Sequence, residues 1–158
     1  MSDDILKKGL WAARSVDDTM KVYADWADKY DADVLTEGYA TPHRIAHALT
    51  QFCDGDALIL DFGCGTGLSG QALQHAGFHH VDGIDISAEM LAIAKDRHIY
   101  REIWQGKPGE MTDVMPGLYT VIVAAGVISL GAAPPDTLTM CLDHLDPGGL
   151  LALSFNDP

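Results

Sequence analysis

The sequence has few basic residues and few cysteines for its length of 158 residues. Ten Lys and Arg stand against 23 Asp and Glu, which gives a formal net charge of −13 at pH 7. Such a surface repels a phosphate backbone rather than neutralising it, so we expect no nucleic-acid partner. The three cysteines are widely spaced and include no C-x-x-C pair. This number and spacing predict neither a disulfide framework nor a zinc site, and they favour a reducing compartment.

The sequence also lacks a signal peptide and a membrane span. Residues 1–18, MSDDILKKGLWAARSVDD, are charged and contain no apolar core of the kind that signal peptides have. No apolar run approaches the length that crosses a bilayer. We therefore expect a cytoplasmic protein without a membrane partner. Hydrophobic residues make up 47% of the chain, which suits one domain with a proper core.

The first third of the chain reads as helical. Apolar residues recur at steps of three and four over residues 17–30, which predicts an amphipathic helix; they are Met20, Tyr23, Ala27 and Tyr30. The segment TPHRIAHALTQFC predicts a second helix, with Thr41 as N-cap and Pro42 at the first helical position. Its expected apolar face consists of Ile45, Ala48, Leu49 and Phe52. We assign residues 1–53 to this helical lead and residues 54–158 to the main domain.

From Ala57 onward, short apolar runs alternate with helical segments. The runs predict strands at residues 57–62, 81–86, 100–105, 119–125 and 149–155. The segments between them predict helices at residues 68–77, closed near Gly77, at 87–97, capped by Ser87, and at 134–145. Alternating strands and helices predict a doubly wound α/β fold, with a mainly parallel sheet covered by helices on both faces.

A glycine-rich stretch, LDFGCGTGLSG, follows the first predicted strand. Glycine has no Cβ, so a ligand can approach the main chain closely, and the next helix directs free N–H groups toward the same loop. Gly63, Gly65 and Gly67 match one nucleotide fingerprint. Gly65, Gly67 and Gly70 match the G-x-G-x-x-G pattern of nicotinamide-dependent oxidoreductases. Both interpretations are open at this point.

Asp85 ends the second predicted strand. A carboxylate at this position can accept hydrogen bonds from both hydroxyls of an adenosine ribose. Its separation from Gly63 is that of one βαβ unit. The glycine-rich loop and this acid together predict a cofactor that contains adenosine.

These residues carry a family resemblance. The segments LILDFGCGTG, VDGIDISAEMLAIAK and LDPGGLLALSF resemble, in this order, the class I S-adenosylmethionine-dependent methyltransferases, over about residues 57–155. The segments VYADWADKYDAD, YREIWQGKP and VISLG are also similar to the methyltransferase-like group named for the Williams-Beuren chromosomal region. The resemblance implies a Rossmann-like fold and S-adenosylmethionine as cofactor, with S-adenosylhomocysteine as product. It further implies methyl transfer to a small-molecule acceptor.

The resemblance also implies roles for individual positions. Main chain at Gly63, Cys64 and Gly65 would approach the methionyl and ribose parts of the cofactor. Asp61 would lie near the amino group, directly or through water, and Asp85 would bind the ribose. The other implied contacts are Ile86 and Met90 with adenine, Gly106 and Lys107 in the third-strand loop, and Ala125 beside the sulfur. Tyr23, Trp26 and Tyr30 of the lead helix either pack in the core or cover the cofactor, since an aromatic face attracts the sulfonium cation. Lys107 replaces an Asp that many relatives use for the adenine amino group, so adenine recognition would rely on other groups.

The sequence assigns no catalytic residue and no metal site. Tyr39, His43 and Ser129 are candidate general bases by location alone. His43 and His47 lie one helical turn apart, but no third ligand follows at a suitable spacing. Two other functions stay open: a nicotinamide-dependent oxidoreductase that uses Gly65, Gly67 and Gly70, and a binding module that holds S-adenosylmethionine without catalysis.

The chain stops after the fifth predicted strand, whereas the family normally adds a helix and two further strands. The resemblance therefore implies a truncated form of a seven-stranded sheet. Its fifth strand, GLLALSF, would be an edge with unpaired backbone groups and almost no charge. We expect this edge to pair with another copy of the chain, or the chain to be a fragment of a longer one.

Overall fold

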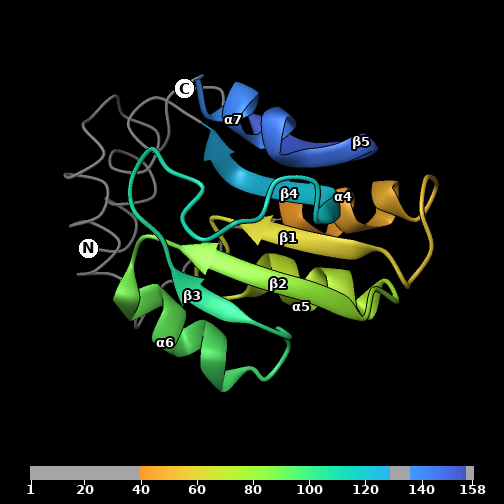
Figure 1. Cartoon of the computed structure of the whole chain (residues 1–158). Helices are drawn as coiled ribbons and strands as arrows, with labels where there is room; N and C mark the ends of the chain where they lie inside the picture. The colour runs from red at the N-terminus through yellow and green to blue at the C-terminus, as the bar shows by residue number, and fades with distance from the viewer. Residues whose placement is uncertain (1–39, 129–135, 156–158) are drawn as a thin grey trace.

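The structure, a computed structural model, describes residues 40–128 and 136–155 (Figure 1). These residues form a parallel five-stranded sheet in the order β3–β2–β1–β4–β5. The strands are β1 (Leu58–Phe62), β2 (His80–Asp85), β3 (Ile103–Gln105), β4 (Tyr119–Ile128) and β5 (Leu145–Phe155). The helices are α4 (Thr41–Leu49), α5 (Leu68–His75), α6 (Ala88–Asp96) and α7 (Asp136–His144). The predicted α/β fold and the order of its elements are confirmed.

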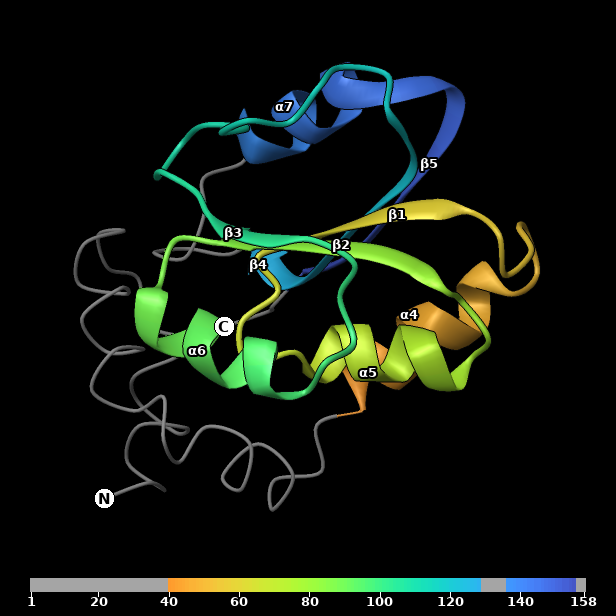
Figure 2. The ribbon, with the colours of Figure 1, turned by 60° about the horizontal axis from the view of Figure 1, so that its bottom comes forward.

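Helices cover both faces of the sheet. Figure 2 shows α4, α5 and α6 along one face and α7 on the other. Alternate residues of β1 point to opposite faces: Ile59 packs in one buried cluster with Leu49 of α4 and Leu73 of α5. Leu60 packs in a second cluster, which includes Cys141 of α7. A strand buried on both faces explains the continuous apolar run that predicted it.

The start of α4 differs from the prediction. The N-cap is Ala40 rather than Thr41, and no side chain caps the helix. The reason is that the backbone N–H of Arg44 already donates to the carbonyl of Ala40, at 3.1 Å, so Thr41 lies within the first turn. Pro42 in this first turn costs no hydrogen bond, because N–H groups at the start of a helix have no partner within the helix.

The apolar face of α4 is also shifted from the prediction. Ala48 is exposed, and 73% of Phe52 is exposed. The helix ends at Leu49, so Phe52 lies in the following turn and does not continue the helical face. The buried residues follow the i, i+3, i+4, i+7 spacing of a single helix face; they are Pro42, Ile45, Ala46 and Leu49. This face packs against the sheet in the same cluster as Ile59.

Two predicted helix boundaries are confirmed. Ser87 is the N-cap of α6, and its hydroxyl accepts a 3.2 Å hydrogen bond from the N–H of Met90. Gly77 follows the end of α5 with a φ of +99°, the left-handed conformation that favours glycine after a helix. The helix predicted over residues 17–30 lies outside the described residues. Among those that the structure describes, no helix combines the length and the apolar character needed to cross a bilayer.

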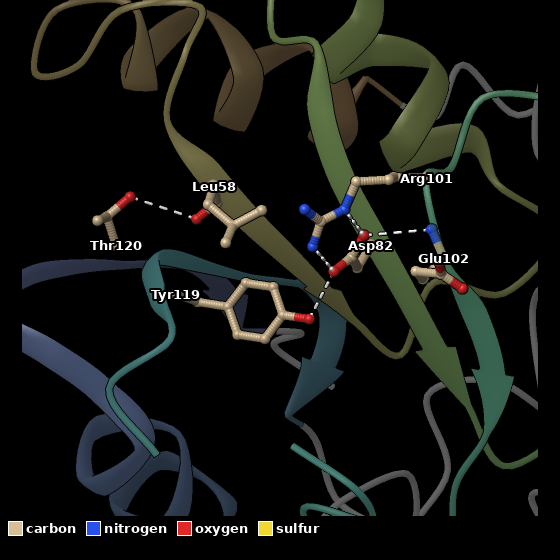
Figure 3. A network of polar contacts seen from close by, with 6 residues as sticks. All are labelled: Leu58, Asp82, Arg101, Glu102, Tyr119 and Thr120. Atoms are coloured by element: carbon tan, nitrogen blue, oxygen red, sulfur yellow. Dashed lines mark hydrogen bonds and ion pairs between the residues drawn. The ribbon is translucent and has the colours of Figure 1, made fainter. Parts of the chain in front are cut away.

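A buried carboxylate joins three strands on the α7 side of the sheet (Figure 3). Asp82 of β2 is 1% exposed and is the register partner of Leu60, so both side chains point to this face. Arg101 donates to both oxygens of Asp82, at 2.9 and 2.7 Å, and the hydroxyl of Tyr119 donates at 2.6 Å. The backbone N–H of Glu102 completes the set at 3.2 Å. These bonds hold β2 to the segment before β3 and to the start of β4.

Candidate functional site

The carboxyl ends of β1 and β2 lie side by side, and the glycine-rich loop begins there. The N–H groups of Gly63 and Cys64 both donate to the carbonyl of Ile84, at 2.9 and 3.0 Å. The N–H of Gly65 donates to Oδ2 of Asp85 at 2.8 Å. These three bonds fix the loop after β1 to the end of β2, so the two sequence features that predicted a nucleotide site form one structural unit.

Asp85 ends β2, and the residue as a whole is partly exposed. Its other oxygen, Oδ1, accepts a 2.8 Å hydrogen bond from the N–H of Ser87. Burial raises the pKa of Asp85, and the N–H groups of Ser87 and Gly65 act in the opposite direction. Each carboxylate oxygen has two lone pairs, so both retain capacity for a further donor. The side chain can therefore accept hydrogen bonds from two hydroxyls of a ligand.

The glycines of the loop lack side chains for different reasons. A Cβ at Gly63 would collide with the side chain of Val127 on β4. A Cβ at Gly67 would lie 2.9 Å from Cδ of Arg97, whose Nε donates to the carbonyl of Thr66. At Gly65, by contrast, a Cβ would meet nothing within 4 Å, and φ is +56°. The main chain of Gly65 is thus the part of the loop that an external molecule can approach.

Gly70 has a packing role. A Cβ at this position would collide with the ring and hydroxyl of Tyr100. The nicotinamide interpretation needs Gly70 for contact between the helix and the strand, and it also needs β1 to end near Cys64. The strand ends at Phe62 instead. The third glycine of the G-x-G-x-x-G match is therefore explained by its contact with the Tyr100 side chain.

A small recess with a cavity volume of about 30 Å³ opens between this loop, the start of α4 and β4. Its lining includes four of the residues predicted to bind cofactor, Gly63, Cys64, Gly65 and Ala125. The other four residues were not predicted as contacts, because their approach depends on how α4 and α5 pack against the loop; they are Pro42, Thr66, Leu68 and Ser69. Only part of a nucleoside-sized ligand can enter this volume.

The remaining predicted contacts follow β2 and β3 at the same edge of the sheet. Gly106 is buried, its N–H donates to the carbonyl of Asp85 at 2.9 Å, and a Cβ there would lie 2.8 Å from Cδ1 of Ile84. Ile86 is partly exposed, Lys107 is exposed and Met90 is 1% exposed. None of these lines the recess. Tyr30, Tyr39 and Ser129 lie outside the described residues.

Asp61 is buried behind the loop, on the α5 side of the sheet. Its Oδ2 accepts hydrogen bonds from Oγ of Ser69, at 2.6 Å, and from the hydroxyl of Tyr100, at 2.7 Å. Oδ1 is equally buried and has no hydrogen-bond partner among the described residues. Burial raises the pKa of Asp61 to about 6, the two hydroxyls act to lower it, and the nearby charge of Asp85 acts to raise it. An unpaired buried acceptor costs about 1–3 kcal/mol.

The environment of Cys64 disfavours a role as nucleophile. The side chain is 3% exposed, and burial raises the pKa of its thiol well above the usual value. A thiol reacts as the thiolate, which this site disfavours. The buried thiol is instead a small side chain accommodated in a crowded turn.

Comparisons with known proteins give a consistent result. Residues 60–151 match the family model described as "Methyltransferase domain". The chain is 35% identical to human methyltransferase-like protein 27 over 136 residues, which covers 84% of the chain and 55% of the human protein. It is 40% identical over 74 residues to the 18S rRNA (guanine-N(7))-methyltransferase RID2 of Arabidopsis thaliana, which covers 47% of the chain and 24% of that protein. The chain thus spans about half the length of its human relative, and less of the plant protein.

A solved structure shows the same fold. The TehB-like SAM-dependent methyltransferase of Corynebacterium glutamicum superposes with a TM-score of 0.64 at 21% identity, which covers 84% of this chain and 72% of that one. At this identity the likeness concerns the fold alone. The fold prediction thus has independent support.

Proposed function

Because the chain belongs to the class I S-adenosylmethionine-dependent methyltransferases, we propose that its glycine-rich loop and Asp85 bind S-adenosylmethionine for methyl transfer. The observation that carries the proposal is the hydrogen bond between Gly65 and Asp85. This bond places a carboxylate beside Gly65. Of the four loop glycines at positions 63, 65, 67 and 70, only Gly65 has free space where a Cβ would lie.

The residues present fit this cofactor. Gly65 presents bare main chain, and Asp85 can accept from the ribose hydroxyls. The unpaired Oδ1 of Asp61 is an acceptor suited to a cationic amino group, reached directly or through a water molecule. Ala125 and Gly63 line the recess where the methionyl part would lie. Ile86, Met90, Gly106 and Lys107 remain our proposed contacts for the adenine side.

The chemistry requires little from the side chains. S-Adenosylmethionine supplies a methyl carbon that its sulfonium already makes electrophilic. The protein has to hold an acceptor atom in line with that carbon, and such positioning supplies up to roughly 7–11 kcal/mol. The eight lining residues of the recess include no His, Asp, Glu or Lys. The described part of the chain therefore places no general base in the recess, and we propose catalysis by positioning.

We propose a small molecule as the acceptor. The balance of ten basic against 23 acidic residues opposes binding to a phosphate backbone. Several relatives are rRNA methyltransferases by name, but their matches cover only 47–50% of this chain. Incubation of the protein with labelled RNA at low salt provides the test, because electrostatic binding is strongest there. Retention of RNA in a filter assay at low salt would show the acceptor class to be wrong.

Isothermal titration calorimetry tests the cofactor assignment. S-Adenosylhomocysteine should bind with a 1:1 stoichiometry, and NAD should give no heat of binding above dilution. NAD binding without a response to S-adenosylhomocysteine would support the oxidoreductase instead. Methyl transfer from labelled S-adenosylmethionine to a library of small amines, thiols and acids would then separate an enzyme from a module that only binds.

Two further expectations remain proposals. Among the described residues, the outer side of β5 pairs with no other strand, so we propose that this edge associates with a second copy of the chain. Light scattering that shows a monomer at all concentrations would oppose it. The cysteines Cys53, Cys64 and Cys141 are all free, in keeping with our proposal of a cytoplasmic location.

A further inference from the structure

We propose that Tyr100 is a positioning residue of the cofactor site, which occupies Oδ2 of Asp61 and so keeps Oδ1 available for the cofactor's amino group. The inference rests on the proposed function and adds a residue to it. Tyr100 precedes β3 and lies 39 positions from Asp61 in the sequence.

Two glycines leave the space through which the Tyr100 side chain reaches Asp61. The ring of Tyr100 packs against Gly70 of α5 and Gly83 of β2. A Cβ at Gly70 would collide with the hydroxyl end of the ring, and a Cβ at Gly83 would lie 3.0 Å from ring carbons. Gly83 is also the register partner of Asp61, so the path leads to the carboxylate across the neighbouring strand. The absence of side chains at Gly70 and Gly83 thus allows the Tyr100 hydroxyl to donate to Asp61.

The two carboxylate oxygens of Asp61 differ in their hydrogen bonds. Ser69 and Tyr100 both donate to Oδ2, whereas Oδ1 has no partner among the described residues. Burial keeps the pKa of Tyr100 well above its usual value, so its hydroxyl stays protonated and can only donate here. With Oδ2 occupied by two donors, the buried Oδ1 is the oxygen that is left to accept from a cationic N–H group.

The hydroxyl also affects the charge on Asp61. The titratable groups that face Asp61 are Tyr100, Cys64 and Asp85. Burial raises the pKa of Asp61 most, and the Tyr100 hydroxyl is one of two hydrogen bonds that oppose the rise. Loss of this bond therefore increases the fraction of protonated Asp61, and a protonated carboxyl attracts an ammonium group less.

Two ligands separate this role from a general effect on folding. S-Adenosylhomocysteine has the amino acid part, and 5′-methylthioadenosine has the same nucleoside and sulfur without it. In Tyr100→Phe, we expect the Kd of S-adenosylhomocysteine at pH 7 to rise about three- to tenfold. The Kd of methylthioadenosine should change by less than about twofold. The loss for S-adenosylhomocysteine should be larger at pH 6 than at pH 8.

Two further variants complete the design. Tyr119→Phe removes an equivalent bond, from a tyrosine hydroxyl to the buried Asp82, on the other face of the sheet. It should leave both Kd values unchanged. Gly70→Ala keeps the hydroxyl but displaces it from Asp61, and it should repeat the ligand-selective loss even if Tyr100→Phe does not fold.

Equal weakening of both ligands, or no weakening, in Tyr100→Phe or in Gly70→Ala would overturn the role of Tyr100. Failure of the unmodified protein to bind either ligand would instead overturn the proposed function. The two failures are therefore distinguishable in one set of titrations.

Discussion

Oδ2 of Asp85 accepts a hydrogen bond from the N–H of Gly65 at 2.8 Å, so the end of β2 fixes the loop that follows β1. Twenty residues separate the two partners in sequence. The bond joins the open main chain of Gly65 to the carboxylate that we assign to the ribose. This contact links the two halves of the proposed cofactor site directly, so a change at either residue affects the other.

Asp85→Asn should weaken binding of S-adenosylhomocysteine by at least about tenfold. The amide keeps the size of the side chain but loses the charge, and a hydrogen bond to a charged acceptor contributes roughly 1.5–3 kcal/mol. Calorimetry at pH 7.5 measures the change. Asp96→Asn removes an exposed carboxylate at the end of α6 and provides the control for net charge. An equal effect of the two substitutions would mean that Asp85 does not contact the ligand.

Gly65→Ala should abolish detectable binding, whereas Gly77→Ala should not. Both glycines have a positive φ, +56° and +99°, and at both a Cβ would meet nothing within 4 Å. Each substitution therefore brings a similar backbone strain, of about 1 kcal/mol. Only Gly65 lines the recess, so only there would the new methyl group occupy space that the ligand needs.

Thermal unfolding of the two glycine variants should show similar losses of stability, and calorimetry should separate them. If Gly65→Ala bound S-adenosylhomocysteine as well as Gly77→Ala does, the ligand would not approach the loop at this glycine. The pair thus tests the location of the site without depending on the identity of any side chain.

Much of this site could be predicted from local sequence. Gly63, Gly65 and Asp85 were identified from their order and spacing, because a strand, a tight loop and a helix are each encoded by nearby residues. The cap at Ser87 was correct for the same reason, since its partner is three positions away. At Thr41 the same rule was wrong by one residue, because the backbone N–H of Arg44 donates to the carbonyl of Ala40 and the helix therefore begins one residue earlier.

The contacts that the sequence did not reveal join residues far apart in the chain. The sequence places Tyr100 only at the start of the strand predicted over residues 100–105, and nothing local links it to Asp61. A signal did exist at Asp82, which is a charged residue in the middle of a strand predicted to be buried. A buried carboxylate needs partners, but Arg101 and Tyr119 are 19 and 37 positions away. Their selection depends on the order of the strands in the sheet.

The free energy of unfolding of the ligand-free protein should depend on pH because Asp61 titrates at different pH values in the folded and unfolded states. Its pKa in the folded state is about 6, above the ordinary value of 3.8. The unfolded chain therefore releases this proton first, and the contribution of Asp61 to stability falls as pH rises from about 4 to about 6. Over this window the change is about 3 kcal/mol.

Asp61→Asn removes this titration while its amide oxygen can still accept from Ser69 and Tyr100. Urea denaturation at pH 4, 5, 6 and 7 should show the variant gaining stability relative to the unmodified protein as pH rises. The same variant should bind S-adenosylhomocysteine more weakly at pH 7.5, because its amide cannot attract a cation. A constant difference in stability across these pH values would show that Asp61 is ionised normally in the folded protein.

Tyr119→Phe should reduce stability without affecting the ligand site. Burial and the hydrogen bond to Asp82 both raise the pKa of Tyr119, so its hydroxyl remains a donor at all ordinary pH values. Its loss removes a 2.6 Å hydrogen bond to a buried carboxylate, which should cost about 1–3 kcal/mol of the free energy of unfolding.

Asp82 keeps Arg101 and the N–H of Glu102 in this variant, so the fold should persist. Asp82→Ala, in contrast, leaves three donors without their acceptor at the junction of β2, β3 and β4, and it should cost about 3–5 kcal/mol. Urea denaturation of both variants measures the two losses. If Tyr119→Phe were as unstable as Asp82→Ala, the Tyr119 hydroxyl rather than the Arg101 ion pair would hold this junction together.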